Sequence, residues 1–139
     1  MLAKECMTKN VEMGQPNMSL VQAAKLMKEG DFGILPVRDQ DRLVGMITDR
    51  DIAIRAVAEG KDPTKSLVGE VMTEKVLYCY DDQDVNEVVK NLGENQIRRL
   101  PVLNRQKRLV GILSLGNLAK SDANPKEVDA ALAHICSKK

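Results

Sequence analysis

The feature that most constrains this chain is an internal repeat with an offset of 65 residues, the spacing from Met7 to Met72. Three short motifs recur in the same order: Met7-Thr8 as Met72-Thr73, Pro36-Val37 as Pro101-Val102, and, after one extra turn residue, Arg42-Leu43-Val44-Gly45 as Arg108-Leu109-Val110-Gly111. Two copies of one supersecondary unit can bury each other's apolar faces. The repeat therefore predicts a pseudo-two-fold module with a cleft between its copies, where a ligand could bind.

Each copy predicts an amphipathic helix with recognisable ends. The first has a capping box, Ser19 with Gln22, and an apolar stripe of Leu20, Ala23, Ala24 and Met27. The second has Asp84 with Glu87, and a stripe of Val85, Val88, Val89 and Leu92. Gly30 and Asn95 follow the two stripes, and we expect them to end the helices in a left-handed conformation.

Two strands and a second helix follow in each copy. Pro36 and Pro101 lack an N–H and are expected at the start or edge of a strand. The mostly apolar segments 43–47 and 109–113 predict buried strands, and helices are expected to begin at Thr48 and Ser114. The predicted order is strand, helix, strand, strand, helix. The fold class is α/β (α+β).

These boundaries divide the chain into four parts. Residues 2–60 form the first repeat, 61–66 a linker, 67–120 the second repeat and 121–139 a helical tail. Asn124-Pro125 predicts the start of the tail helix, with an apolar stripe of Val128, Ala131, Leu132 and Ile135. We expect this helix to pack on the module or on a partner subunit.

Charge and composition argue against several classes of function. The formal charge is +1, from 21 basic and 20 acidic residues, so nothing favours binding to nucleic acid or to an anionic membrane. No apolar run is long enough to cross a bilayer, and no secretory signal is visible. Three widely spaced cysteines, Cys6, Cys79 and Cys136, fit reduced thiols in a cytoplasmic protein.

The ordered motifs resemble a tandem pair of CBS domains, the modules named after cystathionine β-synthase. The resemblance rests on the Met-Thr openings, the Leu-Pro-Val strands, the Leu-Val-Gly strands and the helix that begins Thr48-Asp49-Arg50-Asp51. It covers roughly residues 2 to 120. It implies a stand-alone CBS pair that forms a homodimer and binds an adenosyl ligand.

Thr48 and Asp51 are the leading candidates for ligand contact. Free N–H groups at a helix start attract anions, and Thr48 adds a hydroxyl there. One turn on, the Asp51 carboxylate could accept two hydrogen bonds from a ribose diol. The resemblance assigns such contacts to this Thr-x-x-Asp spacing. The alternative is that Thr48 only caps the helix, while the carboxylates complement its dipole.

The second copy departs from this pattern. Ser114 keeps the hydroxyl, but Asn117 replaces the carboxylate and lacks the charge that strengthens such hydrogen bonds. The cleft is therefore expected to be asymmetric, with the stronger site at Asp51. Arg98 and Arg99 stand where the first copy has Gly33 and Ile34, and the resemblance implies that they reach phosphates. A solvated pair on a strand edge is the alternative.

The remaining candidates surround these positions. Gly33 would let the backbone approach a ligand closely, and the resemblance implies that the stretches Asn10-Val11-Glu12 and Lys75-Val76-Leu77 cover an adenine base. The full set of predicted ligand-binding residues is Val11, Gly33, Ile34, Pro36, Thr48, Arg50, Asp51, Val76, Arg98, Arg99, Pro101, Ser114 and Asn117. No metal site is expected, because His134 and Cys136 supply only two ligands.

The function predicted is a regulatory, non-catalytic module that senses an adenosyl ligand. AMP, ADP, ATP, NAD and S-adenosylmethionine are the candidate ligands, and no cofactor is required. An effector protein of unknown identity would respond to the ligand. The alternative is an interaction or stabilising protein with an empty, degenerate cleft. An enzyme acting on a nucleotide is disfavoured, because Asp49 is the only potential base beside Thr48 and Asp51.

Overall fold

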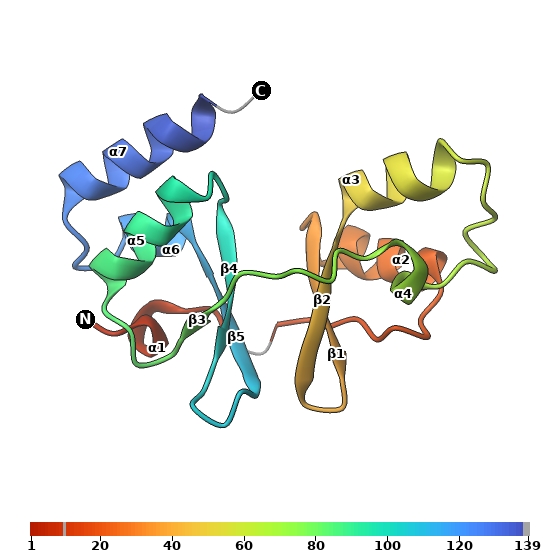
Figure 1. Cartoon of the computed structure of the whole chain (residues 1–139), viewed down its shortest axis with the longest axis horizontal. Coiled ribbons are helices and arrows are strands. Elements are labelled where there is room, and N and C mark those ends of the chain that lie inside the picture. Colours follow the sequence, from red (N-terminus) through yellow and green to blue (C-terminus); the bar gives the residue numbers. More distant parts are fainter. Residues whose placement is uncertain (10, 138–139) are drawn as a thin grey trace. The chain divides into compact units, whose positions relative to one another are not determined.

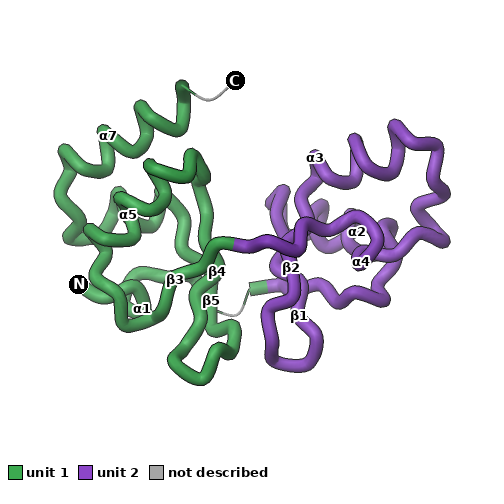
Figure 2. Tube along the Cα trace, in the orientation of Figure 1, with its two compact units in different colours: residues 1–11, 77–139 green, residues 12–76 purple. Residues whose placement is uncertain are grey.

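A computed structural model describes residues 1–9 and 11–137 and divides the chain into two compact units. Unit 1 comprises residues 1–11 and 77–139, and unit 2 comprises residues 12–76 (Figure 2). These units do not follow the borders of the sequence repeats. The first residues of each copy belong to the unit that contains the strands of the other copy.

Unit 2 contains a two-stranded antiparallel sheet, β1-β2, with short helices (Figure 1). Its elements are α2 (Leu20–Gly30), β1 (Ile34–Asp39), β2 (Arg42–Thr48), α3 (Asp49–Ile52), a π-helical turn η1 (Ala53–Val57) and α4 (Val68–Val71). The strand expected before α2 is reduced, among the described residues, to an isolated parallel bridge between Gly14 and Val37.

Unit 1 repeats this plan around a three-stranded sheet of order β3-β4-β5. Its elements are α1 (Ala3–Cys6), β3 (Cys79–Tyr80), α5 (Val85–Glu94), β4 (Arg99–Leu103), β5 (Leu109–Ser114), α6 (Leu115–Ala119) and α7 (Pro125–Cys136). β3 pairs parallel to β4, and β5 pairs antiparallel to it. The mixed α/β class and the C-terminal helix agree with the prediction, whereas the helical turns α1 and α4 were not predicted.

Each Met-Thr dipeptide pairs with a strand of the opposite copy. Thr8 exchanges two backbone hydrogen bonds with Ile112 in β5, at 2.8 and 3.0 Å. Thr73 does the same with Met46 in β2, at 2.8 and 2.9 Å. The repeated Met-Thr motif therefore marks the place where the opening segment of one copy adds to the sheet of the other.

The glycine of each Leu-Val-Gly strand makes room for this pairing. A Cβ at Gly111 would lie 2.7 Å from the Thr8 carbonyl oxygen and 2.8 Å from the Met7 sulfur. At Gly45 the corresponding distances, to the Thr73 carbonyl oxygen and the Met72 sulfur, are both 2.8 Å. Real Cβ atoms do not approach backbone oxygen this closely, so both positions require glycine.

Both prolines lie inside strands rather than at their starts. Pro36 pairs with Met46, and Pro101 pairs with Ile112. The backbone N–H and carbonyl of Met46 form hydrogen bonds with Thr73, and those of Ile112 form hydrogen bonds with Thr8. The β1-β2 and β4-β5 ladders therefore need no proline N–H at these positions, and the interior placement is tolerated.

The predicted helix ends are partly wrong. Gly30 is the last residue of α2, and Asn95 has a φ of −93°. The left-handed residues are the next ones along, Asp31 with a φ of 53° and Gln96 with 54°. Asp and Gln can occupy this region at a modest cost, so glycine and asparagine were misleading signals.

The N-terminal caps follow the prediction, with one exception. The capping box of Ser19 and Gln22 is present, and Asn124 caps α7 with Pro125 in its first turn. Asp84 caps α5 by accepting the Asn86 N–H. Glu87 does not complete a box, because its carboxylate accepts a hydrogen bond from the Gln83 amide, at 2.8 Å.

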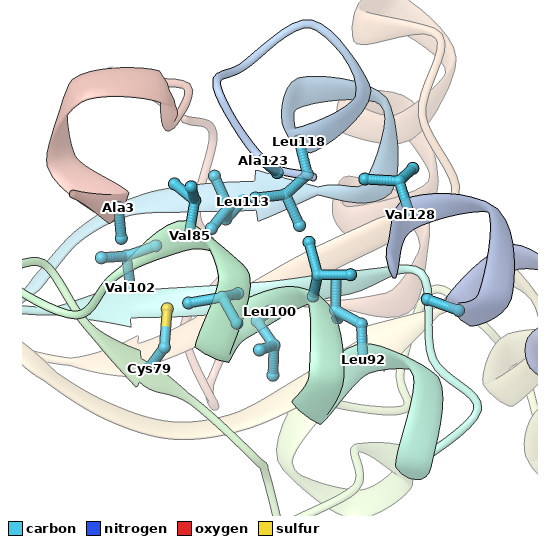
Figure 3. Close-up of a cluster of buried hydrophobic side chains, with 13 residues drawn as sticks. Ala3, Cys79, Val85, Leu92, Leu100, Val102, Leu113, Leu118, Ala123 and Val128 are labelled. Atoms are coloured by element: carbon cyan, nitrogen blue, oxygen red, sulfur yellow. The ribbon is translucent and has the colours of Figure 1, made fainter. Parts of the chain in front are cut away.

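Each unit has its own apolar core. The core of unit 1 contains Val85, Leu92, Leu100 and Leu113 from the helix and sheet (Figure 3). In unit 2, Leu20, Leu35 and Ile47 are fully buried. No helix among the described residues is long and apolar enough to span a bilayer.

The tail helix α7 packs on α5 and α6 of unit 1 (Figure 1). Ala131 of α7 lies against Gly93 of α5: a Cβ added at Gly93 would lie 3.0 Å from the Cα of Ala131. Val128, Ala131 and Ile135 are buried, but Leu132 is 44% exposed and does not share their stripe. Val89 of α5 is buried, whereas Ala24, the equivalent residue of α2, is exposed despite its predicted place in the apolar stripe.

The three cysteines are free thiols. Cys79 lies fully buried in the core of unit 1, and this burial raises the pKa of its thiol to about 12. The thiol is therefore protonated at neutral pH and packs as a small apolar side chain. Cys136 is exposed on α7.

Candidate ligand-binding site

The predicted site residues form two equivalent groups, one in each unit. In unit 2, the antiparallel register pairs Ile34 with Thr48, and we call the surrounding residues Gly33, Ile34, Pro36, Thr48, Arg50 and Asp51 the Thr48 half-site. In unit 1, the register pairs Arg99 with Ser114, and we call Arg98, Arg99, Pro101, Ser114 and Asn117 the Ser114 half-site. The strand pairing brings each predicted group together.

A reciprocal capping box holds the Thr48 half-site. The Asp51 N–H donates to Thr48 Oγ1, and the Thr48 N–H donates to Asp51 Oδ2, both at 3.0 Å. The Asp51 side chain is 15% exposed, and its Oδ1 lies 3.9 Å from Arg55 Nε. Because a carboxylate has about four lone-pair positions, Asp51 keeps capacity to accept further hydrogen bonds.

The Ser114 half-site has the same capping box, but the side-chain acceptor is the amide oxygen of Asn117. Asn117 Oδ1 accepts two hydrogen bonds, from the Ser114 N–H at 2.9 Å and from the Ser114 hydroxyl at 2.8 Å. The other polar atom of this side chain, Nδ2, can only donate. Asn117 is therefore not the simple acceptor for a ribose hydroxyl that the sequence suggested.

The start of α3 differs from the expectation of a free anion site. The Asp49 N–H donates to the Gly33 carbonyl at 2.9 Å, and the Arg50 N–H donates to Asp49 Oδ1 at 2.8 Å. The Asp51 N–H is used by Thr48. All three N–H groups of this turn therefore have partners within the chain.

The two valines expected to cover an adenine base belong to different units. Val76 belongs to unit 2 with Thr48, and Val11 belongs to unit 1 with Ser114. Both are half-buried, and each stands three residues after its Met-Thr bridge. Asn10, named with Val11 in the sequence analysis, lies outside the described residues.

Arg98 and Arg99 are exposed at the start of β4. Their backbone is fixed by the Leu115 N–H, which donates to the Arg98 carbonyl at 2.9 Å, and by the pairing of Arg99 with Ser114. Both side chains carry a positive charge and are exposed at the start of the strand that pairs with Ser114. Within residues 1–9 and 11–137, no group of three or more His, Cys, Asp or Glu side chains is arranged to hold a metal ion.

Asp49 is not among the predicted ligand-binding residues, but it lies next to Gly33 of the Thr48 half-site. A Cβ on Gly33 would lie 2.6 Å from Asp49 Oδ2, so the carboxylate lies directly over this glycine. The sequence does show Gly33 directly before one strand and Asp49 directly after the next strand. That the two residues are neighbours becomes visible only when the register of β1 and β2 is known.

Duplicated strand-turn-helix units, each closed by the other copy's Met-Thr segment, define a tandem α/β module. The CBS domain model matches residues 3–57 and 68–124, and the chain belongs to the CBS domain family.

Three similar proteins place the chain within this family. The CBS domain-containing protein YhcV of Bacillus subtilis is 38% identical over 132 residues, which cover 95% of this chain and 93% of that protein. Hypoxic response protein 1 of Mycobacterium tuberculosis is 37% identical over 119 residues, or 85% of this chain and 82% of that protein. Its crystal structure, with two coordinated zinc ions, has a TM-score of 0.79 at 36% identity and covers 86% of this chain and 98% of that one.

The third similar protein was solved with adenosyl ligands. The CBS domain pair of protein MJ0100 was solved in complex with 5′-methylthioadenosine and S-adenosyl-L-methionine. It has a TM-score of 0.75 and 30% identity, and it covers 86% of this chain and 98% of that chain.

Proposed function

We propose that this protein is a non-catalytic regulatory module that senses an adenine nucleotide or another adenosyl ligand. The observation that carries the proposal is the part-buried Asp51 carboxylate, held by Thr48 with acceptor capacity to spare. A carboxylate in this state is suited to the hydroxyls of a ribose. The adenosyl ligands of the MJ0100 domain pair support the same ligand class. We further propose a cytoplasmic location and an effector protein, still to be identified, that responds to the bound state.

A second candidate function is supported by the same capping box. Thr48 and Asp51 satisfy each other, so they could serve only to begin the helix, as in an interaction or stabilising protein without a ligand. A thermal-shift panel of AMP, ADP, ATP, NAD and S-adenosylmethionine separates the two functions. A ligand at a hundred times its Kd stabilises the folded state by about 2.7 kcal/mol. Analysis of products after incubation tests for catalysis.

Asp51→Ala is expected to weaken binding of the adenosyl ligand by about 1.5–3 kcal/mol, the scale of hydrogen bonds to a charged group. Titration calorimetry measures the change. Asp51→Asn is the matched control for folding, because Asn117 shows that an amide can complete the same capping box. If Asp51→Asn binds as the wild type while Asp51→Ala does not, the cap rather than the carboxylate charge supports binding.

The Ser114 half-site supplies the comparison variants for this series. Asn117→Ala is expected to cost less than Asp51→Ala, since Asn117 Oδ1 is already used by Ser114. Arg99→Ala is expected to weaken phosphorylated ligands more than adenosine, because a guanidinium binds phosphate through its planar fork of donors. Loss of binding in Asn117→Ala with none in Asp51→Ala would reverse the order of the two half-sites.

We propose that the protein forms a homodimer by closed two-fold packing. Most of the tail stripe is buried within unit 1, which removes one of the apolar faces suggested by the sequence. Ile54 and Val57 of η1 remain 47% and 63% exposed. Light scattering at tens of micromolar is expected to give the dimer mass, and Val57→Arg is expected to lower it. A monomeric wild type at that concentration contradicts the proposal.

A further inference from the structure

The two half-sites have the same backbone hydrogen-bond pattern but differ in the charges of their side chains. The Asp49 N–H donates to the Gly33 carbonyl, and the Leu115 N–H donates to the Arg98 carbonyl, both at 2.9 Å. Because each unit has this hydrogen bond, Gly33 and Arg98 occupy equivalent structural positions, and so do Asp49 and Leu115. A glycine and a carboxylate in unit 2 thus replace a guanidinium and an apolar side chain in unit 1.

The carboxylate of Asp49 is fixed in the Thr48 half-site. Its Oδ1 accepts the Arg50 N–H at 2.8 Å, and its Oδ2 lies 2.6 Å from where a Gly33 Cβ would stand. Any side chain at Gly33 would displace it. Asp49 is also exposed, so its charge faces the solvent from which a ligand arrives.

The same arrangement leaves a phosphate no backbone donor at the start of α3. The N–H groups of Asp49, Arg50 and Asp51 already donate to Gly33, Asp49 and Thr48. A 5′-phosphate would find no free backbone N–H at residues 49–51 and would face the Asp49 carboxylate. In the Ser114 half-site, Leu115 cannot cap the next N–H, and Arg98 and Arg99 supply positive charge.

We propose that Asp49 determines ligand specificity at the Thr48 half-site by disfavouring phosphates and favouring neutral or cationic adenosyl compounds. This inference rests on the proposed function, because it takes Asp51 as the ribose acceptor. Asp49 and Asp51 share one helical turn, so the 5′ substituent of a ribose held by Asp51 lies within a Debye length of Asp49. At about 7 Å and the dielectric constant of water, one unit of ligand charge changes affinity by about threefold, and more where the pair is partly shielded.

The test is titration calorimetry with adenosine, AMP and S-adenosylmethionine, whose 5′ substituents are neutral, anionic and, at the sulfonium, cationic. Asn117→Ala combined with Arg99→Ala serves as the background, so that the Thr48 half-site is measured. In this background, Asp49→Asn is expected to strengthen AMP binding about three- to tenfold and to weaken S-adenosylmethionine by a similar factor. Adenosine should stay within about twofold, and the changes should shrink as salt is raised. Glu59→Gln removes an exposed carboxylate elsewhere in unit 2 and should leave all three affinities unchanged.

The outcomes separate this inference from the function on which it rests. If Asp51→Ala weakens all three compounds but Asp49→Asn leaves their affinity ratios unchanged, the specificity role of Asp49 is overturned and the ligand site stands. Equal shifts of AMP and adenosine in Asp49→Asn overturn it as well. If none of the three compounds binds the wild type, this inference fails. If Asp51→Ala has no effect on the compounds that bind, the proposed ribose contact fails and this inference fails with it.

Discussion

Leu92→Ala is expected to lower the free energy of unfolding by about 3–5 kcal/mol, the range for removing a fully buried leucine from a core that cannot collapse around the gap. Leu92 has no exposed surface and lies on α5 in the core of unit 1 (Figure 3). The helix α5 also packs against α6 and α7, so the cavity would be surrounded by fixed elements. Urea unfolding followed by far-ultraviolet circular dichroism measures the change.

Leu132→Ala is the matched control for this substitution. Leu132 is also a helical leucine of unit 1, but 44% of its surface is exposed. Its truncation removes little buried area, and alanine favours helix slightly, so the stability should change by less than about 0.5 kcal/mol. Similar losses for Leu92→Ala and Leu132→Ala would contradict the assigned core.

Gly111→Ala is expected to destabilise the protein by about 2–3 kcal/mol. The added Cβ would stand 2.7 Å from the Thr8 carbonyl oxygen, which also accepts the Ile112 N–H at 3.0 Å. A backbone carbonyl held in this way cannot swing aside as a side chain could, so the cost lies near the top of the range for overpacking. Chemical denaturation of the full chain measures it.

Gly116→Ala distinguishes this steric effect from a general effect of replacing glycine. Gly116 lies in α6, and its nearest potential contact is Ser114 Oγ at 3.6 Å. Alanine there should stabilise the helix by roughly 0.5–1 kcal/mol. A Gly111→Ala protein as stable as the wild type would mean that the Met7-Thr8 segment does not occupy the place described.

Most of the helices and strands could be predicted from the sequence, because they depend on interactions between residues close together in the chain. The Ser19 and Asn124 caps, the long helices and the four main strands follow from periodicity and from residues adjacent in sequence. The left-handed ends at Asp31 and Gln96 were missed because the usual residue preference pointed one position too early.

Long-range pairing explains what the sequence did not predict. The offset of the Met-Thr motif showed a duplication, but not that Thr8 pairs with Ile112 and Thr73 with Met46. Both glycine positions follow from that pairing. For the candidate site, spacing predicted Thr48 with Asp51 and Ser114 with Asn117, since each pair lies within one turn. Asp49 was missed because its position over Gly33 depends on strand register.

Unit 1 is built from two separate segments of the chain, and this affects the order in which its parts are synthesised. Unit 2 is a single stretch, residues 12–76, so all of it is synthesised before β4 and β5. Thr8 is made before unit 2, yet its sheet partner Ile112 is made more than a hundred residues later. Thr8 therefore stays without this partner while all of unit 2 is synthesised, and unit 1 can close only after β5 has been made.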